Sequence, residues 1–353
     1  MKKLLFFLLL FFPLMVNAVS AEAYAVMDYD SGRILMSKNE NKEKLIASTT
    51  KIMTAIIALE KGDLNSVRTV GSEVLKAYGS AIYIEMNEEI TLKDLLYGLM
   101  LRSGNDAAIE IAYHVAGDME TFVEWMNQKA YELGMSHTKF YNNHGLEEND
   151  GTANISTAYD MALLMRYALR NDTFREIIGT ENYTAKTSTK TYVWHNKNKL
   201  LGSYEYQIGG KTGFTEKARR TLVTASTKDS KTCIVVTLND GNDFEDHKDL
   251  CDSVFAKYER VLLIDKDSLV IDSSDPSKYY VQESYYALLT EEEKKQVKIT
   301  YDLHANSEEE EVGVVQIYLK DELLGTEKIY QKKDETLSKE GFLQKFFRWL
   351  FGW

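Results

Sequence analysis

Residues 47–55 of the chain read Ala47-Ser48-Thr49-Thr50-Lys51-Ile52-Met53-Thr54-Ala55. Ser48 and Lys51 stand three residues apart, and on a helix this spacing puts both side chains on one face, roughly one turn apart. The residues that follow, 52–60, are apolar nearly all round, which is typical of a buried helix. The sequence therefore predicts a central helix over residues 48–61 that carries a serine and a lysine in its first turn.

A serine and a lysine in this arrangement can perform nucleophilic chemistry. A serine hydroxyl is a poor nucleophile at neutral pH and needs a neighbouring base to accept its proton. A lysine amine can be that base where burial and nearby positive groups lower its pKa. The positive end of the helix dipole would point at the same place. On this stretch alone, an N-cap serine followed by a surface lysine is the other interpretation, so further motifs have to decide.

Two further motifs follow in the chain. The first is Leu101-Arg102-Ser103-Gly104-Asn105-Asp106, which offers a hydroxyl and an amide two residues apart. The second is Gly209-Gly210-Lys211-Thr212-Gly213-Phe214-Thr215, which offers a second lysine framed by glycines, ahead of a strand-like run at 221–225. Ser-x-x-Lys, Ser-x-Asn and Lys-Thr-Gly, in this order, are the motifs of the penicillin-binding proteins and serine β-lactamases.

The sequence around the three motifs resembles one family within this group. These segments, together with Asn143-His144-Gly145-Leu146 and Ser156-Thr157-Ala158-Tyr159-Asp160-Met161-Ala162, are similar to the low-molecular-mass penicillin-binding proteins that are serine-type D-alanyl-D-alanine carboxypeptidases. The resemblance covers roughly residues 24–262. Ile46 and Asn143 occupy positions where many members have proline, a difference that concerns loop rigidity and no catalytic atom.

The resemblance implies an α+β fold of the β-lactamase/transpeptidase type. Such a domain has an antiparallel sheet flanked by helices plus a helical subdomain, with the active site between them. The order of the predicted elements favours the same arrangement, because strands come first, then a long helical insertion, then strands and a last helix. The predicted strands are 24–27, 34–36, 183–187, 191–195, 222–225 and 233–238, and the further helices are 90–101, 106–115, 119–133, 157–169 and 244–263.

The resemblance also implies the roles of the motif residues in catalysis. Lys51 would take the proton of Ser48, which attacks the carbonyl between two D-alanines. Ser103 would relay a proton to the leaving amine. The reaction removes the terminal D-alanine from peptidoglycan stem pentapeptides through an acyl-enzyme, and penicillin and other β-lactam antibiotics would acylate the same serine. This chemistry needs no metal and no organic cofactor.

The same resemblance assigns substrate binding to the second and third motifs. Asn105 would hold the peptide amide, and Lys211 and Thr212 would bind the free carboxylate of the terminal D-alanine. Gly213 and Phe214 of the same motif would also belong to the substrate-binding residues. The backbone N–H of Phe214 would form the oxyanion hole together with that of the nucleophilic serine.

Two rival functions share the motif set. A serine β-lactamase needs a group, in many a carboxylate, that activates the deacylating water, and Glu147 and Glu148 after His-Gly-Leu are the tempting candidates. A catalytically inactive peptidoglycan-binding protein on the same fold would be expected to have lost Ser48 or Lys51, and both are present. His144, in the same segment as the two glutamates, is interpreted as a hydrogen-bonded loop residue.

Residues 1–21 have the layout of a secretory signal peptide. Lys2 and Lys3 precede an apolar run from 4 to 16, and small residues follow it up to Ala21. We expect cleavage after Ala21, with Ala23 as the second candidate. An uncleaved anchor is the alternative, but the apolar run is shorter than the roughly 20 residues of a membrane span. The protein is therefore expected to be exported and to act at the outer face of the cytoplasmic membrane.

After the carboxypeptidase-like region, 22–262, the pattern changes twice. Short alternating runs at 268–271, 279–281, 297–303, 312–319 and 327–330 predict a small all-β domain over 263–335. Residues 336–353 then place phenylalanine and leucine on one helical face, basic residues on the other, and two tryptophans near the end. This composition predicts an amphipathic helix that anchors the protein peripherally on the membrane surface; packing onto the protein's own body is the alternative.

Composition bounds the partners and the redox chemistry. The net charge is −12, and removal of Lys2 and Lys3 with the signal peptide leaves 40 basic against 54 acidic residues, or −14. This charge argues against nucleic acid as a partner, because phosphate binding needs a basic face. No CxxC or HExxH zinc spacing occurs. Cys233 and Cys251 could form a disulfide in an exported protein, but the apolar run around Cys233 favours buried free thiols.

Overall fold

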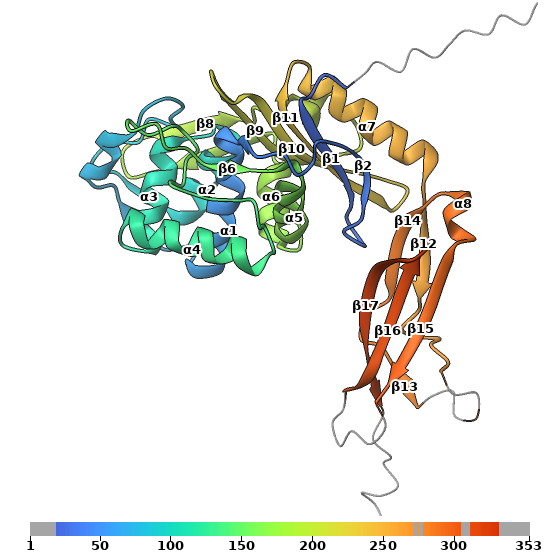
Figure 1. The fold of residues 1–353 in the computed structure, drawn as a ribbon. Helices are drawn as coiled ribbons and strands as arrows, with labels where there is room; N and C mark the ends of the chain where they lie inside the picture. The colour runs from blue at the N-terminus through green and yellow to red at the C-terminus, as the bar shows by residue number, and fades with distance from the viewer. Residues whose placement is uncertain (1–18, 272–273, 275–277, 305–310, 332–353) are drawn as a thin grey trace, which may run out of the picture.

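The computed structural model describes residues 19–271, 274, 278–304 and 311–331. Figure 1 shows a larger part of mixed helix and sheet and a smaller part made mainly of strands, joined after helix α7. The α+β fold class predicted from the sequence is confirmed. Most of the predicted signal peptide and the whole predicted membrane helix, 336–353, lie outside the described residues.

A five-stranded antiparallel sheet forms the centre of the larger part. Its strand order, β2-β1-β11-β10-β9, places the N-terminal hairpin beside strands from the far end of this part. The predicted hairpin at 24–36 and the predicted strands at 222–225 and 233–238 are confirmed. The five strands are β1 (Ala23–Asp28), β2 (Ile34–Lys38), β9 (Gln207–Thr215), β10 (Arg219–Lys228) and β11 (Lys231–Asp240).

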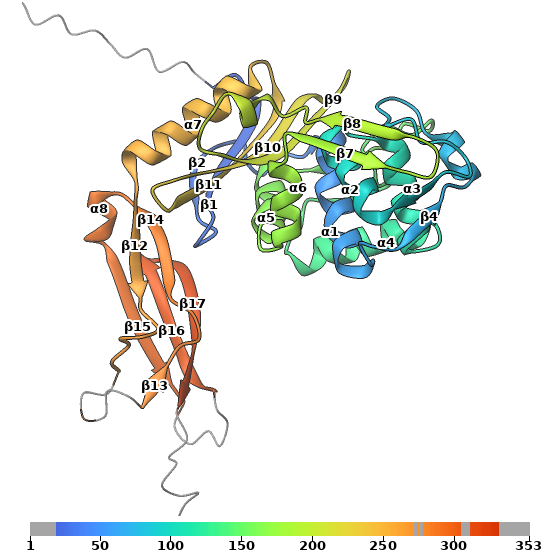
Figure 2. The same cartoon turned by 180° about the vertical axis from the view of Figure 1, so that it is seen from behind.

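Side chains of this sheet alternate between two hydrophobic cores. On β1, Ala25 and Met27 belong to the larger core and Val26 to the smaller one, because successive strand residues point to opposite faces. Helix α5 (Ala158–Ala168) packs on the first face and helix α7 (Asp243–Lys257) on the second. The two views in Figures 1 and 2 show these helices on opposite sides of the sheet, which is therefore covered on both faces.

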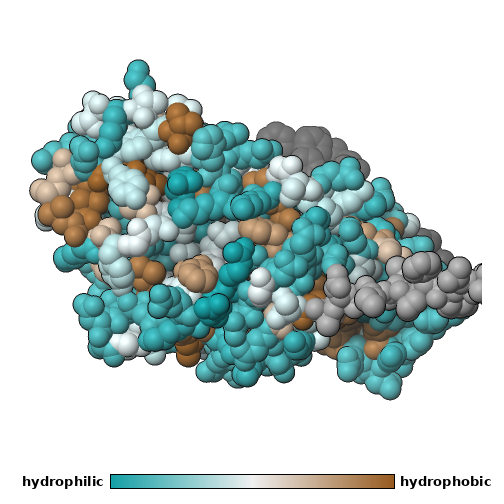
Figure 3. All heavy atoms as spheres, turned by 90° about the horizontal axis from the view of Figure 1, so that it is seen from above, coloured by the Kyte–Doolittle hydropathy of each residue, from teal (hydrophilic) through white to brown (hydrophobic). Residues whose placement is uncertain are grey.

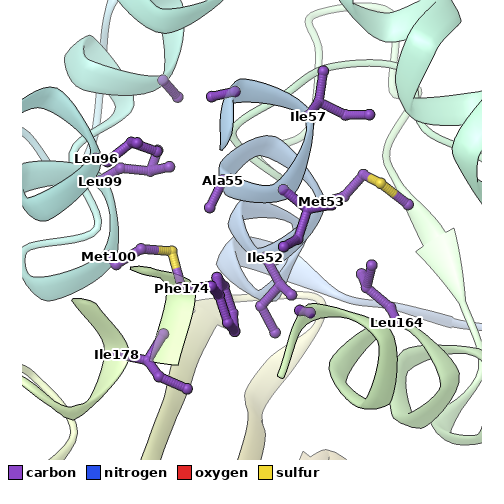
Figure 4. Packing of buried hydrophobic residues seen from close by; sticks show 14 of the residues in the cluster. Ile52, Met53, Ala55, Ile57, Leu96, Leu99, Met100, Leu164, Phe174 and Ile178 are labelled. Carbon is purple, nitrogen blue, oxygen red and sulfur yellow. The ribbon is translucent and has the colours of Figure 1, made fainter. Parts of the chain in front are cut away.

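The predicted central helix is confirmed, although its first turn is tighter than an α-helix. A 3-10 turn, η1 (Ala47–Thr50), leads into α1 (Lys51–Lys61), and every residue from 51 to 58 is buried. Figure 4 shows Ile52 of this helix with Leu164 and Phe174 from other helices gathered around it. The other helices of the subdomain are α2 (Leu92–Leu101), α3 (Asn105–Val115), α4 (Met119–Glu132) and α6 (Asp172–Gly179).

Short strand pairs and 3-10 turns complete the larger part. The predicted strands at 183–187 and 191–195 are confirmed and form a hairpin of their own, β7 (Asn182–Lys186) with β8 (Thr191–His195). The remaining elements are β3 (Lys44–Leu45) paired with β6 (Ile155–Ser156), β4 (Val67–Thr69) paired with β5 (Glu89–Thr91), and the 3-10 turns η2 (Ser72–Lys76) and η3 (Lys199–Gly202).

The C-terminal part consists of two small antiparallel sheets. One pairs β12 with β14, and the other has the strand order β13-β17-β16-β15. The predicted strands at 279–281, 297–303, 312–319 and 327–330 are confirmed, whereas the predicted domain limits stay predictions. The elements are β12 (Glu259–Ile264), β13 (Tyr279–Tyr280), β14 (Tyr285–Leu289), α8 (Glu291–Lys294), β15 (Val297–Leu303), β16 (Glu311–Leu319) and β17 (Glu322–Gln331).

Two predictions about this region are wrong. The helix predicted over 244–263 ends at Lys257, because Tyr258 is extended and residues 259–264 form β12. Strand β14 was not predicted, and its antiparallel pairing with β12 supplies the hydrogen bonds that keep residues 259–264 extended. Residues 268–271, predicted as a strand, form turns and irregular backbone.

The two cysteines meet in the smaller core. Cys233 on β11 and Cys251 on α7 are both buried and free, and their Sγ atoms lie 3.5 Å apart. The contact with Cys251 and burial raise the pKa of the Cys233 thiol. The interpretation of both residues as buried free thiols is confirmed.

A buried carboxylate joins the larger part to the C-terminal part. Asp28, the last residue of β1, accepts hydrogen bonds from the backbone N–H of Leu288 at 2.9 Å and of Asp30 at 3.1 Å. Asp28 and Leu288 are both 0% exposed. Close by, Arg260 of β12 pairs with Asp30 at 2.6 Å. Since the Asp28 oxygens satisfy a buried donor of β14, the stabilities of the two parts are coupled at this point.

Asp28→Ala removes this acceptor and leaves the Leu288 N–H buried without its partner. We expect the free energy of unfolding to fall by about 1–3 kcal/mol, the cost of an unsatisfied buried donor, as measured by urea denaturation at pH 7. Asp28→Asn is the matched control, because its amide oxygen can still accept the bond. An alanine variant as stable as the wild type would contradict this role of Asp28.

Candidate active site

The start of the central helix brings Ser48 and Lys51 together, as their spacing predicts. Lys51 Nζ lies 3.2 Å from Ser48 Oγ, and 2.6 Å from both Asn105 Oδ1 and the carbonyl oxygen of His144. The Lys51 side chain is 0% exposed. A neutral amine has two N–H donors and one lone pair. The two short bonds can therefore go to Asn105 and His144, which leaves the lone pair for the Ser48 hydroxyl.

The electrostatic surroundings of Lys51 favour its neutral form. Burial lowers the pKa of Lys51 well below its usual value, and the positive charges of Lys211 and Lys197 lower it further. The negative charge of Asp106 opposes this shift. Lys51 can therefore accept a proton at a pH where an exposed lysine is already protonated.

Ser103 and Asn105 lie where α2 passes into α3. Ser103 has a positive φ of 62° and is 4% exposed. Asn105 accepts from Lys51 through Oδ1, while its Nδ2 donates to the Tyr78 carbonyl at 2.6 Å and its backbone N–H donates to the Ser80 carbonyl at 2.7 Å. One side chain thus connects the central helix to the loop that contains residues 78–80.

Strand β9 carries the third motif along the edge of the sheet. Lys211 is 1% exposed, and its Nζ donates to the Thr212 carbonyl at 2.8 Å. Burial and the charge of Lys197 lower the pKa of Lys211 to about 7. A Cβ atom at Gly213 would lie 3.0 Å from the backbone nitrogen of Ser48. Glycine is therefore what lets this strand approach the serine so closely.

A cavity of about 330 Å³ opens at Ser48. The predicted residues on its wall are Ser48, Ser103, Thr212, Gly213 and Phe214. Its wall also contains residues that the sequence analysis did not predict, namely Ser80, Lys197, Lys199, Arg220, Asp243 and Phe244. The other predicted residues, Lys51, Asn105 and Lys211, are buried and bonded to residues at the site. The structure therefore brings all the predicted site residues together.

The residues that sequence reasoning missed come from segments far apart in the chain. The buried carboxylate of Asp106 accepts from the backbone N–H of Ile82 at 3.0 Å and of Tyr83 at 2.7 Å, and so holds a loop beside the site. Lys197 reaches the cavity from the segment between β8 and η3. Asp106 follows directly after the second motif and could have been noticed there, whereas nothing in the sequence around Lys197 indicates its position.

The His144 segment supports Lys51 from the other side. The Leu146 N–H donates to His144 Nδ1 at 3.1 Å, and burial together with the charge of Lys51 lowers the pKa of His144 to about 3. Its imidazole is therefore neutral, and the interpretation as a hydrogen-bonded loop residue is confirmed. Gly145 has a φ of 88°, and a Cβ atom there would lie 1.9 Å from the carbonyl oxygen of Ala47.

The carboxylates considered for a β-lactamase are engaged elsewhere. Glu147 pairs with Lys217, and Glu148 accepts from Asn142 Nδ2 at 2.7 Å. Neither glutamate belongs to the described lining of the cavity. Within the described part of the chain there is also no cluster of three or more His, Cys, Asp or Glu side chains that could hold a metal ion.

Comparison with known proteins agrees with this geometry. The family of D-alanyl-D-alanine carboxypeptidases matches residues 13–242. The D-alanyl-D-alanine carboxypeptidase DacF of Bacillus subtilis is 29% identical in an alignment of 358 residues that covers 95% of this chain and 90% of the relative. A D-alanyl-D-alanine carboxypeptidase of a Streptomyces species is 35% identical in an alignment of 240 residues that covers 62% of this chain and 81% of the relative.

Solved structures give the same result. The D-alanyl-D-alanine carboxypeptidase of Mycobacterium tuberculosis has a TM-score of 0.65 at 31% identity, covering 68% of this chain and 92% of that chain. Penicillin-binding protein 5 of Haemophilus influenzae has a TM-score of 0.74 at 24% identity, covering 90% of this chain and 98% of that chain. At this identity the similarity shows the fold alone.

The fold and the site define a penicillin-binding serine hydrolase. The chain belongs to the family of D-alanyl-D-alanine carboxypeptidases. It is a low-molecular-mass serine carboxypeptidase that acts on peptidoglycan and binds β-lactams, as its resemblance to this family implied. The rival functions, a serine β-lactamase and an inactive binding protein, are not favoured.

Gly145→Ala tests how closely the positions of the His144 segment and of Ser48 depend on each other. The added Cβ would collide with the backbone of Ala47, so we expect it to displace Ser48, to lower the free energy of unfolding by about 1–3 kcal/mol, and to slow acylation by a fluorescent penicillin. Gly151→Ala is the control, because Gly151 has a similar φ of 86° but nothing within 4 Å of the added atom. Equal effects of the two changes would show that backbone strain, and not the contact with Ala47, is responsible.

Proposed function

We propose that Ser48 is the nucleophile and Lys51 the base of this carboxypeptidase. The observation that carries the proposal is the 3.2 Å contact between Lys51 Nζ and Ser48 Oγ inside a site where burial and nearby positive charges favour the neutral amine. Lys51 takes the Ser48 proton as Oγ attacks the carbonyl carbon between the two terminal D-alanines. The peptide is a stem pentapeptide of peptidoglycan.

Charge then develops on the carbonyl oxygen of the substrate. The backbone N–H groups of Ser48 and Phe214 form the oxyanion hole in this proposal. The close approach of β9 to the Ser48 nitrogen at Gly213 supports it, because both donors must face one point. Collapse of the tetrahedral intermediate breaks the C–N bond, and Ser103, on the same cavity wall, relays the proton to the leaving amine of D-alanine. Water then hydrolyses the acyl-enzyme.

The remaining predicted residues bind the substrate. Asn105 holds the peptide amide through its side chain, which is fixed by the bonds to Lys51 and Tyr78. Thr212, on the cavity wall, and Lys211 behind it hold the free carboxylate of the terminal D-alanine. Penicillin acylates the same Ser48, because its lactam carbonyl and carboxylate match those of the peptide. The proposed chemistry uses no metal and no organic cofactor.

We further propose that the protein is exported and held at the outer face of the cytoplasmic membrane by residues 336–353. Among the residues that the structure describes, none of the helices is both long and apolar enough to cross a membrane. The face in Figure 3 is mainly hydrophilic, with hydrophobic side chains scattered over it. The support for peripheral attachment is therefore the amphipathic pattern of the C-terminal sequence, rich in phenylalanine and tryptophan.

Ser48→Ala tests the nucleophile. Without the Oγ atom no acyl-enzyme can form, so we expect both release of D-alanine from a pentapeptide ending in D-Ala-D-Ala and covalent labelling by a fluorescent penicillin to disappear. D-alanine is measured with a coupled amino-acid oxidase assay and labelling on a denaturing gel. Retained labelling in a folded Ser48→Ala protein would place the nucleophile elsewhere.

Truncation tests the membrane helix. The mature chain ending at Thr336 should keep its activity on small peptides, while the chain ending at Trp353 should sediment with anionic liposomes and lose part of this binding at high salt. Burial of several phenylalanine, leucine and tryptophan side chains, each worth about 1.5–3 kcal/mol, and attraction of basic residues to anionic headgroups, about 1 kcal/mol each, drive this binding. Equal partitioning of both forms would mean that residues 337–353 do not bind the membrane.

A further inference from the structure

Lysines surround Ser48, but they differ in access to the cavity. Lys51 and Lys211 are 0% and 1% exposed, and neither belongs to the described cavity wall. Lys197 and Lys199 do belong to it. Of the two lysines of the wall, Lys197 is half-buried and Lys199 is exposed to solvent, whereas Lys51 and Lys211 lie behind the wall.

The third cation of the cavity wall is already paired. Arg220 donates from Nη2 and Nε to one oxygen of Asp243, at 2.6 and 3.0 Å, and its guanidinium lies 5.5 Å from the centre of the Phe244 ring. Asp243 and Phe244 line the same cavity. The carboxylate of Asp243 thus balances the charge of Arg220, which makes Arg220 a weaker attractor for a second anion.

Two hydrogen bonds hold Lys197 in place, one from its backbone and one from its side chain. Its backbone N–H donates to the Leu101 carbonyl at 3.1 Å, and its Nζ donates to Ser80 Oγ at 3.1 Å. The Ser80 carbonyl in turn accepts from the backbone N–H of Asn105. Because Ser80 Oγ is neutral and takes one bond, it does not balance the charge of the ammonium, which has further N–H donors for a ligand. Burial and the charge of Arg102 lower the pKa of Lys197, so an anionic ligand would stabilise its charged form. Lys199 is instead exposed to solvent.

We propose that Lys197 is a specificity-determining residue, whose ammonium contacts the free carboxylate of the terminal D-alanine from the cavity side. Thr212 and Lys211 hold the same carboxylate from the strand. This inference rests on the proposed function and adds to it the group that makes the enzyme require a free C-terminal acid.

The physical basis of this requirement is the free-energy cost of desolvating the Lys197 ammonium when the ligand offers no negative charge. A carboxylate forms a charge-assisted hydrogen bond with the half-buried ammonium of Lys197. A peptide that ends in an amide offers no charge, so the ammonium is desolvated without compensation. The Lys197 side chain is already positioned by Ser80, so little conformational freedom is lost on binding.

Lys197 also acts on the base. The groups that influence the pKa of Lys51 are Lys211 and Lys197, which lower it with burial, and Asp106, which raises it; Arg102 in turn faces Lys197. A lower pKa makes the Lys51 amine neutral at lower pH. Removal of the Lys197 charge should therefore raise the pKa of Lys51 and move the rising limb of the pH profile to higher pH.

The test compares two substrates that differ only in the terminal group. One peptide ends in D-Ala-D-Ala as the free acid and the other ends in D-alaninamide, and kcat/KM is measured for both in wild type, Lys197→Gln, Lys197→Arg and Lys199→Gln. Glutamine can still donate to Ser80 Oγ but has no charge, so the first variant removes the charge alone. Arginine keeps the charge, and Lys199→Gln removes a neighbouring charge of the same cavity wall.

We expect Lys197→Gln to lower kcat/KM for the acid by about tenfold or more relative to the amide, a factor that corresponds to about 1.4 kcal/mol. Lys197→Arg should restore much of the acid preference, and Lys199→Gln should change it less than about twofold, since that side chain is exposed to solvent. The rising limb of the pH profile should shift upward in Lys197→Gln and return in Lys197→Arg. Melting temperatures establish that each variant is folded.

Two results would overturn the inference. If Lys197→Gln lowers kcat/KM equally for the acid and the amide peptide, the role of Lys197 is purely structural. If kcat/KM of that variant stays at the wild-type value for both peptides, Lys197 has no role in recognition. If the folded wild-type protein releases no D-alanine from the acid peptide, the proposed function itself fails and the inference fails with it. An active wild type with an unchanged preference in Lys197→Gln overturns the inference alone.

Discussion

The structure of the site depends on the complete burial of one amine. Lys51 Nζ lies inside the protein and is bonded to Ser48, Asn105 and the His144 carbonyl. A buried polar group without partners is costly, so the central helix, the start of α3 and the His144 loop must all stay in place together. The bonds that satisfy the amine are also the ones that direct it at the hydroxyl, and stability and reactivity are thereby linked.

The same burial explains how Lys51 can serve as the base that we propose. The chain carries a net charge of −12, yet two lysines, Lys211 and Lys197, act on the amine beside the serine. Lys211 and Lys197 both lower the pKa of Lys51, and burial is the larger cause. An acidic protein thus places positive charges around one cavity, where they favour the neutral form of Lys51 and, in the proposed function, attract the carboxylate of the substrate.

The predictions made from the sequence were right where local pattern decides structure. The apolar run after Ser48 predicted a buried central helix, and α1 is buried from Lys51 to Ala58. The helix predicted over 244–263 was wrong past Lys257, because β12 is held extended by its pairing with β14 and not by its own residues. A strand whose partner comes later in the chain has no local pattern that separates it reliably from the end of an amphipathic helix.

The sequence alone was enough to predict a nucleophile, a base and a substrate-binding motif, because three short motifs in a fixed order resemble those of one family. What surrounds these residues became visible only in the tertiary structure. Asp106 restrains a loop through backbone bonds to Ile82 and Tyr83, and Lys197 reaches the cavity through bonds to Leu101 and Ser80. The burial of the site residues and the charges around them depend on segments that are distant in the chain. They therefore cannot be predicted from any single stretch of the sequence.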